Sequence, residues 1–306
     1  MYLGIDIGGT NIKFGVVRED YSIIKKYMIS SEGTKDVEHI VSNIINKCIE
    51  IYSEYPYKKI GVGFPGTVDT EHGICVEADN LPFENVPLAE ILERNLKVKS
   101  VISNDALCAL YGEICVGIGK QYQNFIMLTL GTGVGAGICI NGKPYVGKNG
   151  MAGEVGHMSI NYAGELCSNC GNRGCFEHYA SVTALLNQAQ KAAKKEPNSL
   201  LAKMIEDGIS GKAIFDAMYA GCEVAENVLN QYTEYLSIGI KSLKWIFDPE
   251  AIVIGGAISA QKEYLENALK RGAGDTIEIC VSQLGNDAGI IGAAAIAGAN
   301  GILYKA

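Results

Sequence analysis

Near its start the chain carries the segment Asp6-Ile7-Gly8-Gly9-Thr10-Asn11-Ile12-Lys13, in which a glycine-rich turn separates two β-prone runs. The runs cover residues 2–7 and 12–17, so the segment predicts a hairpin. Glycines in such a turn let backbone N–H groups approach an anion closely. We therefore interpret the turn as a phosphate cradle, and a plain hairpin is the alternative.

The side chains of this segment suit the same interpretation. Thr10 adds a hydroxyl and Lys13 a positive charge. Asp6 could hold Mg²⁺ through water, since this ion prefers carboxylate, phosphate and water oxygens. The candidate nucleotide-binding residues of the segment are Asp6, Gly8, Gly9, Thr10, Asn11 and Lys13.

A second turn of this kind opens the second half of the chain. Residues 125–129 and 135–140 predict strands on either side of Gly131-Thr132-Gly133. The turn lacks the Gly-Lys-Ser/Thr of a P-loop, and it does not open a helix as the dinucleotide fingerprint does. Alone it could be an ordinary bend. Together with the first turn it indicates a duplicated design with one phosphate turn in each half.

Predicted strands and helices alternate around these turns. Apolar residues at helical spacing predict a helix from Asp36, and buried runs predict strands over 60–64 and 98–103. A helix is predicted to begin at Asp105, directly after the second of these strands. Further predicted elements are a helix over 105–116, a mainly helical stretch over 181–247 with a long helix over 224–246, a strand over 251–256 and an Ala/Gly-rich helix over 288–298. This pattern predicts an α/β protein.

The composition is that of an ordinary soluble protein. Of the 306 residues, 48% are hydrophobic and 20% are charged, which allows two packed lobes. The formal charge of -8 would repel nucleic acid, so we expect no such partner. The N-terminus does not have the pattern of a signal peptide, and no apolar run approaches the roughly 20 residues needed to cross a bilayer. We therefore expect a cytoplasmic protein with no membrane partner.

The two turns together resemble the actin-like ATPase architecture of hexokinases and chaperone ATPases, a two-lobed α/β fold of the ribonuclease H-like type. Four more motifs occur in the order and spacing of the ROK family of repressors and sugar kinases: Gly63-Phe-Pro-Gly-Thr-Val-Asp69, Asn104-Asp105-Ala106, Gly153-Glu154-Val-Gly-His157 and Cys170-Gly-Asn-Arg-Gly-Cys175-Phe-Glu177. This resemblance spans nearly the whole chain. It implies an N-terminal lobe over 1–117 and a larger lobe over 118–306, whose final helix could pack back on the first. It also implies that ATP and the active site lie in the cleft between the lobes.

The resemblance implies a catalytic role for Asp105. In this family the matching carboxylate takes the proton of the sugar hydroxyl as it attacks the γ-phosphate. The transition state of phosphoryl transfer is loose, so the carboxylate mainly orients the hydroxyl and accepts the proton late. The alternative is that Asp105 is a helix N-cap, because Asp is favoured there.

The same resemblance supplies candidate partners for the sugar and for the nucleotide. A hexose presents hydroxyls around its whole rim, and each buried one needs a partner. The implied sugar-binding residues are Asn104, Glu154, His157 and Glu177, with Gly66 and Asn80 as further contacts. Exposed charges are the alternative for Glu154 and Glu177. Gly255 and Gly256, at the end of the predicted strand over 251–256, are the implied contacts on the adenosine side, and an ordinary buried strand with a turn is the alternative.

A cluster of His157, Cys167, Cys170 and Cys175 has the composition of a closed tetrahedral zinc site. The family usually separates its first two cysteines by one residue, but here Ser168 stands in that place and Cys167 lies one position earlier. We expect a structural zinc that orders the loop so that His157 and Glu177 meet the sugar. The other seven cysteines are expected to act as small core residues.

The resemblance implies an ATP-dependent hexose kinase, with the 6-hydroxyl of glucose as the leading acceptor. The segment Asn80-Leu81-Pro82-Phe83 is similar to that of the family's glucokinases, with Phe83 where an indole is frequent. N-acetylmannosamine, mannose, allose and fructose remain open as acceptors.

A family repressor is the rival function, but its DNA-binding helices would precede the first hairpin, which starts here at residue 2. A catalytically silent sugar-binding protein is a third possibility, and the resemblance also implies a homodimer.

Overall fold

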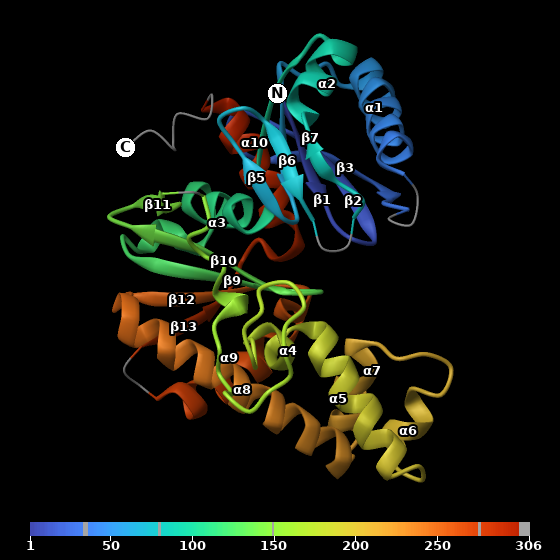
Figure 1. Cartoon of the computed structure of the whole chain (residues 1–306), viewed down its shortest axis with the longest axis vertical. Coiled ribbons are helices and arrows are strands. Elements are labelled where there is room, and N and C mark those ends of the chain that lie inside the picture. The colour runs from blue at the N-terminus through green and yellow to red at the C-terminus, as the bar shows by residue number, and fades with distance from the viewer. Residues whose placement is uncertain (33–35, 79–80, 149, 275–276, 300–306) are drawn as a thin grey trace. The chain divides into compact units, whose positions relative to one another are not determined.

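The computed structural model of the protein describes residues 1–32, 36–78, 81–148, 150–274 and 277–299 (Figure 1). The chain divides into two compact units. Unit 1 comprises Met1–Met127, Ala136–Gly153 and Ser282–Ala306, and unit 2 comprises Leu128–Gly135 and Glu154–Val281. Each unit is therefore assembled from segments that are far apart in the sequence.

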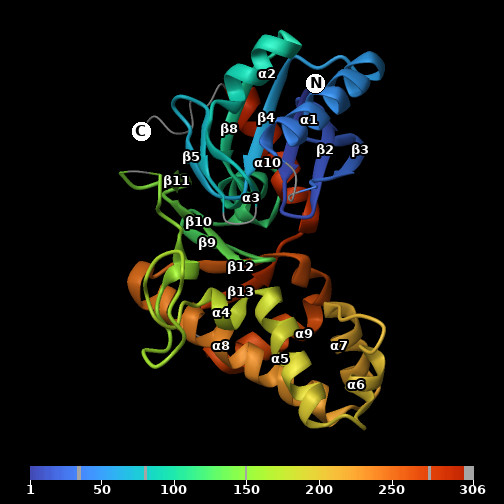
Figure 2. The same cartoon turned by 45° about the vertical axis from the view of Figure 1, so that its right-hand side comes forward.

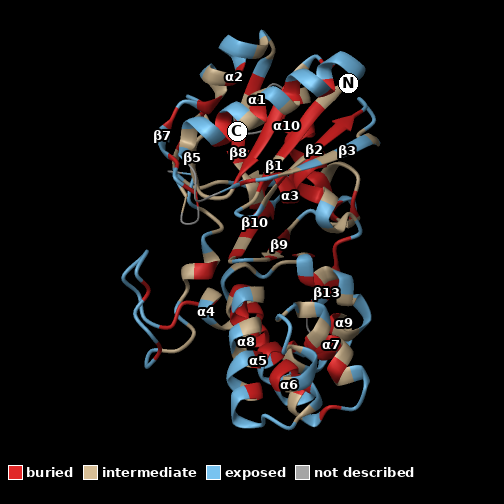
Figure 3. Cartoon of the chain, turned by 90° about the vertical axis from the view of Figure 1, so that its right-hand side faces the viewer, coloured by how far each residue is buried: buried red, intermediate tan, exposed pale blue. Residues whose placement is uncertain are grey.

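Unit 1 contains a five-stranded sheet with the order β3-β2-β1-β4-β8. Its strands are β1 (Tyr2–Ile7), β2 (Asn11–Val17), β3 (Ile23–Ser30), β4 (Lys59–Phe64) and β8 (Lys99–Asn104). β1 is antiparallel to β2 and parallel to β4, and β4 is parallel to β8. The predicted hairpin and the two predicted strands that follow it are confirmed. Figure 3 shows β1 and β2 largely buried.

The strand β3 has no clear signal in the sequence. Its residues are half-buried or exposed, and they include Lys25 and Lys26. The strand is defined by its antiparallel pairing with β2, in which Asn11 lies opposite Ser30. Tertiary pairing therefore decides its conformation, since its own residues do not form a buried face.

The helices of unit 1 are α1 (Val37–Glu54), α2 (Leu88–Leu96), α3 (Asp105–Cys115) and α10 (Ala288–Gly298). The helix predicted from Asp36 is confirmed, and Asp36 is its N-cap, accepting a hydrogen bond from the backbone N–H of His39. Of its apolar residues, Ile40, Val41, Ile44, Cys48 and Ile51 are buried, whereas Ile49 is exposed. A small antiparallel sheet consists of β5 (Thr67–Asp69), β6 (Ile74–Glu77) and β7 (Glu84–Val86).

The Ala/Gly-rich helix α10 packs with its backbone directly against neighbouring backbones. A Cβ atom at Gly4 of β1 would overlap the carbonyl oxygen of Ile290, and one at Gly61 of β4 would overlap that of Ala293. At Gly292, within α10 itself, a Cβ would overlap a carbonyl of α3. The small residues therefore allow α10 to lie against β1, β4 and α3 at once, as the composition predicts for a tightly packed helix.

A second five-stranded sheet has the order β11-β10-β9-β12-β13. Its strands are β9 (Phe125–Leu130), β10 (Val134–Ile140), β11 (Lys143–Tyr145), β12 (Ala251–Gly256) and β13 (Glu278–Val281). Counted along the chain, both sheets have the order third, second, first, fourth, fifth. The duplicated design expected from the two glycine turns is therefore confirmed at the level of sheet topology.

Unit 2 adds most of the helices (Figure 2). They are α4 (Glu177–Ala180), α5 (Val182–Lys195), α6 (Leu200–Met204), α7 (Gly211–Tyr219), α8 (Glu223–Phe247) and α9 (Lys262–Ala273). The predicted long helix is α8, and the ring of Phe176 packs where a side chain at Gly239 of α8 would otherwise lie. Because Phe176 is fully buried, this contact anchors the chain immediately before α4. The remaining short helical turns are η1 (Ile118–Gln121), η2 (Val155–His157), η3 (Ala257–Gln261) and η4 (Gly285–Asp287).

Six of the seven cysteines outside the cluster are buried, as expected, and Cys115 is half-buried. Burial raises the pKa of the Cys48 thiol to about 12, so it stays neutral in the core. Among the described residues, no helix is long and apolar enough to span a membrane.

Candidate active site

The first glycine turn is closed by its own backbone and supported by Ser31. The N–H of Gly8 donates to the carbonyl of Asn11 at 3.0 Å. Ser31 is buried, and its N–H donates to the carbonyl of Thr10 while its hydroxyl donates to the carbonyl of Gly9 at 2.7 Å. Gly9 and Thr10 are themselves exposed. The turn therefore has a fixed shape with its outer side open to a ligand. No motif in the sequence identifies Ser31.

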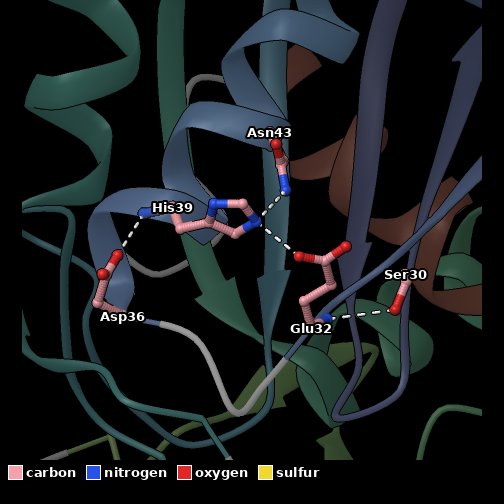
Figure 4. Close-up of polar contacts among 5 residues, drawn as sticks. All are labelled: Ser30, Glu32, Asp36, His39 and Asn43. Carbon is pink, nitrogen blue, oxygen red and sulfur yellow. Dashed lines mark hydrogen bonds and ion pairs between the residues drawn. The ribbon is translucent and has the colours of Figure 1, made fainter.

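The segment that follows this support is tied to the start of α1 (Figure 4). Glu32 has a φ of 46°, and its N–H donates to the hydroxyl of Ser30. Its carboxylate lies 2.6 Å from Nε2 of His39, which Asn43 also contacts at 3.1 Å. Asp36 caps the same helix turn through the N–H of His39. These contacts hold the end of β3, and with it the support of the glycine turn.

Asp6 and Lys13 form an ion pair across the hairpin. They are register partners in β1 and β2, and Nζ of Lys13 lies 3.0 Å from Oδ2 of Asp6. Gly289, in the first turn of α10, lies so close that a Cβ there would be 3.1 Å from the Asp6 carboxyl carbon. A helix N-terminus favours negative charge, so α10 and Lys13 both stabilise the carboxylate. The role of α10 at this point could not be found from the sequence.

Asn104 is the N-cap of α3, and Asp105 is the first residue of that helix. The amide oxygen of Asn104 accepts from the N–H groups of Ala106 and Leu107, and its Nδ2 donates to the carbonyl of Gly66 at 3.2 Å. Asn104 is therefore the N-cap, while Oδ1 of Asp105, the first helical residue, also accepts the N–H of Ala106 at 2.8 Å. Of the two N–H groups on the Asn104 amide, the second is the one that could reach a sugar hydroxyl.

Position 66 requires a glycine because another part of the backbone lies very close to it. A Cβ at this position would overlap the carbonyl oxygen of Glu77, so a larger residue would push apart the turn that Asn104 binds. The Asn104 side chain is thus bonded directly to Gly66. Asn80 lies outside the described residues.

A buried thiol connects Asp105 with Asp6. Cys108 is fully buried, and a Cβ at Gly63 would lie 3.3 Å from its sulfur. The pKa of this thiol is raised well above its ordinary value, first by burial and then by the negative charges of Asp105 and Asp6. Gly63 is the register partner of Asp6, and a Cβ there would also lie 3.5 Å from the Cα atom of Asp105, so both acidic residues lie near this thiol. Unit 1 brings the candidate base and the carboxylate of the first turn together.

The second glycine turn joins three segments of unit 2. The N–H of Gly131 donates to the carbonyl of Gly133 at 3.0 Å, and the carbonyl of Gly131 accepts from Val182 at the start of α5. Gly256 has a φ of +84°, and a Cβ there would overlap the backbone of Leu130. The end of β12 thus lies directly against the residue that precedes the turn, so Gly255–Gly256 and Gly131–Gly133 form one glycine-lined region.

The carboxylate of Glu177 is bound to this turn. The N–H of Val134 donates to Oε2 of Glu177 at 2.9 Å, and a Cβ at Gly133 would overlap the same oxygen. The carbonyl of Val134 lies against Gly156, between Glu154 and His157. Glu177 is therefore half-buried and engaged, which argues against the exposed-charge alternative for it; the Glu154 side chain is exposed. Unit 2 brings three predicted sugar residues to its phosphate turn.

The four predicted metal ligands form one cluster. Their donor atoms all lie within 4.8 Å of one another, and the sulfurs of Cys170 and Cys175 are 3.4 Å apart. Thiolates bound tetrahedrally to zinc at about 2.3 Å lie roughly 3.8 Å apart, so the sulfurs of Cys170 and Cys175 would separate slightly and the more distant donor atoms would move closer. The Nδ1 atom of His157 is buried and has no hydrogen-bond partner among the described residues. A metal would satisfy it.

The displaced first cysteine is accommodated by a tight loop. The pKa of the Cys167 thiol is lowered to about 6, chiefly because the N–H of Cys170 donates to it, and the N–H of Asn169 also contributes. Gly171 makes the loop possible with a φ of +73°, and its N–H donates to the carbonyl of Cys167. Burial raises the pKa of Cys175 to about 12. A thiolate with two backbone donors suits zinc binding, so the donor set fits the metal despite the unusual spacing.

Comparisons with known proteins identify the family and the fold. A sequence model of the ROK family matches residues 2–300. The glucokinase of Thermotoga maritima is 34% identical over 96% of this chain and 96% of its own length. The xylose repressor of Bacillus subtilis is 30% identical over 96% of this chain and 76% of the repressor. A solved ROK family glucokinase from Streptomyces griseus, in complex with glucose and AMPPNP, has a TM-score of 0.88 and 32% identity, covering 97% of this chain and 98% of that one. These similarities confirm the two-lobed, actin-like α/β fold.

Proposed function

The chain belongs to the ROK family, and we propose that it transfers the γ-phosphate of ATP to a hexose, with the 6-hydroxyl of glucose as the leading acceptor. The glucokinase relatives, and the solved relative that binds glucose and AMPPNP, support this choice. The observation that carries the proposal is the arrangement at the start of α3. There Asn104 takes the capping role, and Asp105 and Asp6 lie near one buried thiol.

Asp105 acts as the base in this proposal. It orients the attacking hydroxyl and accepts its proton as the bond to the γ-phosphate forms. Asn104 positions the same sugar through its remaining N–H while its other polar groups hold the helix start and Gly66. The helix and the turn are therefore fixed before the sugar arrives, which favours a productive orientation.

The nucleotide phosphates would bind the two glycine turns. In unit 1 the Gly8–Asn11 turn offers backbone N–H groups, and Lys13 adds a positive charge that is held by Asp6. Asp6 is the residue that would hold Mg²⁺, and when bound this ion would neutralise charge on the phosphates. In unit 2 the Gly131–Gly133 turn and Gly256 form the region for the remaining phosphate and the adenosine.

The sugar hydroxyls would be bound in unit 2 by Glu154, His157 and Glu177. The two ring nitrogens of His157 allow a double role, in which the buried Nδ1 binds the metal and Nε2 contacts a hydroxyl. A zinc ion held by His157 and the three cysteines would be structural and would fix the loop that carries these side chains. The metal takes no part in the reaction steps.

A coupled assay of ADP release tests the proposal over glucose, N-acetylmannosamine, mannose, allose and fructose. Turnover with glucose is expected to exceed that with the other sugars. If turnover is highest with another sugar, the proposed kinase activity stands and that sugar, not glucose, is the acceptor. Absence of turnover with every sugar, combined with measurable sugar binding, would overturn the kinase proposal in favour of a sugar-sensing protein.

We also propose a homodimer, which the family resemblance implies. Light scattering of the purified protein is expected to give twice the mass of the 306-residue chain. A monomer mass at micromolar concentration would contradict it.

A further inference from the structure

The contact between Glu177 and the second glycine turn points to a coupling device. We propose that Glu177 links sugar binding to nucleotide binding: one carboxylate oxygen holds the phosphate turn while the other accepts a sugar hydroxyl. Glu177 is then a positioning residue for the phosphate turn as well as a sugar contact. This inference rests on the proposed kinase function and adds communication between the two ligands.

The two carboxylate oxygens of Glu177 have different surroundings. Oε2 accepts the N–H of Val134 at 2.9 Å and lies over Gly133, where even a Cβ would overlap it. Oε1 lies farther away, 3.8 Å from the same Cβ position. An ionised carboxylate has about four acceptor sites, so the bond to Val134 leaves capacity for a hydroxyl. The carboxylate thus faces the turn with one oxygen and keeps the other for the sugar.

The backbone of Glu177 is held in place from the preceding residues. Phe176 is fully buried against Gly239 of α8, and Cys175 is buried in the predicted metal cluster. The backbone of Glu177 therefore cannot move to follow either ligand, and the side chain is the adjustable part. A charged acceptor also makes the bond to Val134 stronger than a neutral one would be.

Coupling follows from this arrangement. A nucleotide that orders the Gly131–Val134 turn also fixes Glu177, so a sugar that binds next has less conformational freedom to remove. By thermodynamic reciprocity, the sugar must improve nucleotide binding by the same factor. We expect a factor on the order of tenfold, the size of one charge-assisted hydrogen bond made or lost.

Two alanine substitutions in one turn test the link. Gly133→Ala places a methyl group against Oε2 of Glu177, whereas Gly131→Ala is a matched control because no described atom lies within 4 Å of its Cβ position. Neither glycine has a positive φ, so both backbones accept alanine. Gly133→Ala is expected to raise the KM for glucose on the order of tenfold, although Gly133 belongs to the phosphate turn. Gly131→Ala should weaken nucleotide binding and leave the glucose Kd measured without nucleotide unchanged, whereas Gly133→Ala should raise that Kd as well.

Substitutions of Glu177 separate the two oxygens. Glu177→Gln keeps the reach and can still accept the Val134 N–H, so it should weaken glucose binding yet retain the coupling factor. Glu177→Asp is too short to reach Val134 and should lose the coupling. The factor is the ratio of the glucose Kd without and with AMPPNP, measured by calorimetry on the full chain.

The outcomes separate this inference from the proposed function. If wild type binds glucose and AMPPNP with a coupling factor of one, the inference is wrong and the kinase proposal stands. Equal effects of the two alanine variants on glucose would also overturn it, since they would indicate general loosening of the turn. If wild type binds neither glucose nor another hexose, the kinase proposal itself fails.

Discussion

The two glycine turns hold equivalent places in the two sheets, between the first and second strands of each, but they have different partners. The Gly8–Asn11 turn has its charges in its own hairpin, where Asp6 and Lys13 are register partners. The Gly131–Gly133 turn has no charged residue beside it in sequence, and its carboxylate comes from Glu177 in a distant segment. The same kind of turn therefore has charged residues within its own hairpin in unit 1. In unit 2 its charged partner comes from a segment far away in the sequence.

This difference indicates a division of labour. In the proposed mechanism, the charged turn lies near the candidate base Asp105 and would serve the chemical step, whereas the neutral turn contacts the proposed sugar residue Glu177 and would serve binding. Changes in unit 1 should then act mainly on kcat, and changes in unit 2 mainly on KM. The following predictions can confirm or break this division.

The largest effect is expected at the candidate base. Asp105→Asn should lower kcat by roughly three orders of magnitude, because a general base typically contributes about 10²- to 10⁴-fold. Glucose affinity, measured by calorimetry, should change little. Asn104 still accepts from the N–H groups of Ala106 and Leu107, and the amide oxygen of the substituted side chain can accept the Ala106 N–H as the Asp105 carboxylate does, so the helix should remain folded. Near-normal turnover of this variant would show that Asp105 is not the base. It would also contradict the proposed division between kcat effects in unit 1 and KM effects in unit 2.

The metal cluster should control sugar binding in unit 2. Cys175→Ser is expected to abolish the roughly one zinc per chain, lower Tm by about 5 °C and raise the glucose KM more than it lowers kcat. Metal analysis and thermal unfolding measure the first two effects. Cys115→Ser is the control, because this half-buried cysteine lies outside the cluster and should leave the zinc content unchanged. Wild-type protein purified without any bound metal would contradict the site.

The charge of the first turn should act on the nucleotide. Lys13→Met removes a cation beside Asp6 and is expected to lower kcat/KM for ATP about tenfold to a hundredfold. The exposed Lys25 of β3 offers a control, since Lys25→Met should not alter ATP kinetics. Equal losses in the two variants would mean that general charge, and not the hairpin ion pair, attracts ATP.

The smallest effect is expected at the support of the first turn. Ser31→Ala removes the hydroxyl bond to Gly9 and should cost about 1 kcal/mol in the free energy of unfolding measured in urea. The backbone bond to Thr10 remains, so the turn should keep its shape and the ATP KM should rise only slightly. A large loss of kcat would show that the hydroxyl has a direct role that the structure does not indicate.

The sequence predicts those parts of the site that depend on near neighbours. The hairpin that carries Asp6 and Lys13 was predicted, although their ion pair was not, and the junction at Asn104–Asp105 follows from a strand that ends where a helix begins. The capping role was harder to assign, because Asn and Asp are both good caps and only the hydrogen bonds distinguish them. The metal ligands could also be predicted from the sequence, because cysteines in a Gly/Asn-rich loop have few apolar neighbours to pack against.

What the sequence by itself determined is therefore the alternation of strands and helices, the two turns and the family motifs, all of which are readable over a few residues. Tertiary structure alone decided that Glu177 binds Val134, that Gly256 lies on Leu130 and that Gly289 lies against Asp6. These contacts join residues far apart in the chain at positions where a glycine leaves room for another group. A glycine marks where a close approach is permitted, but the packing of the whole unit determines which group approaches.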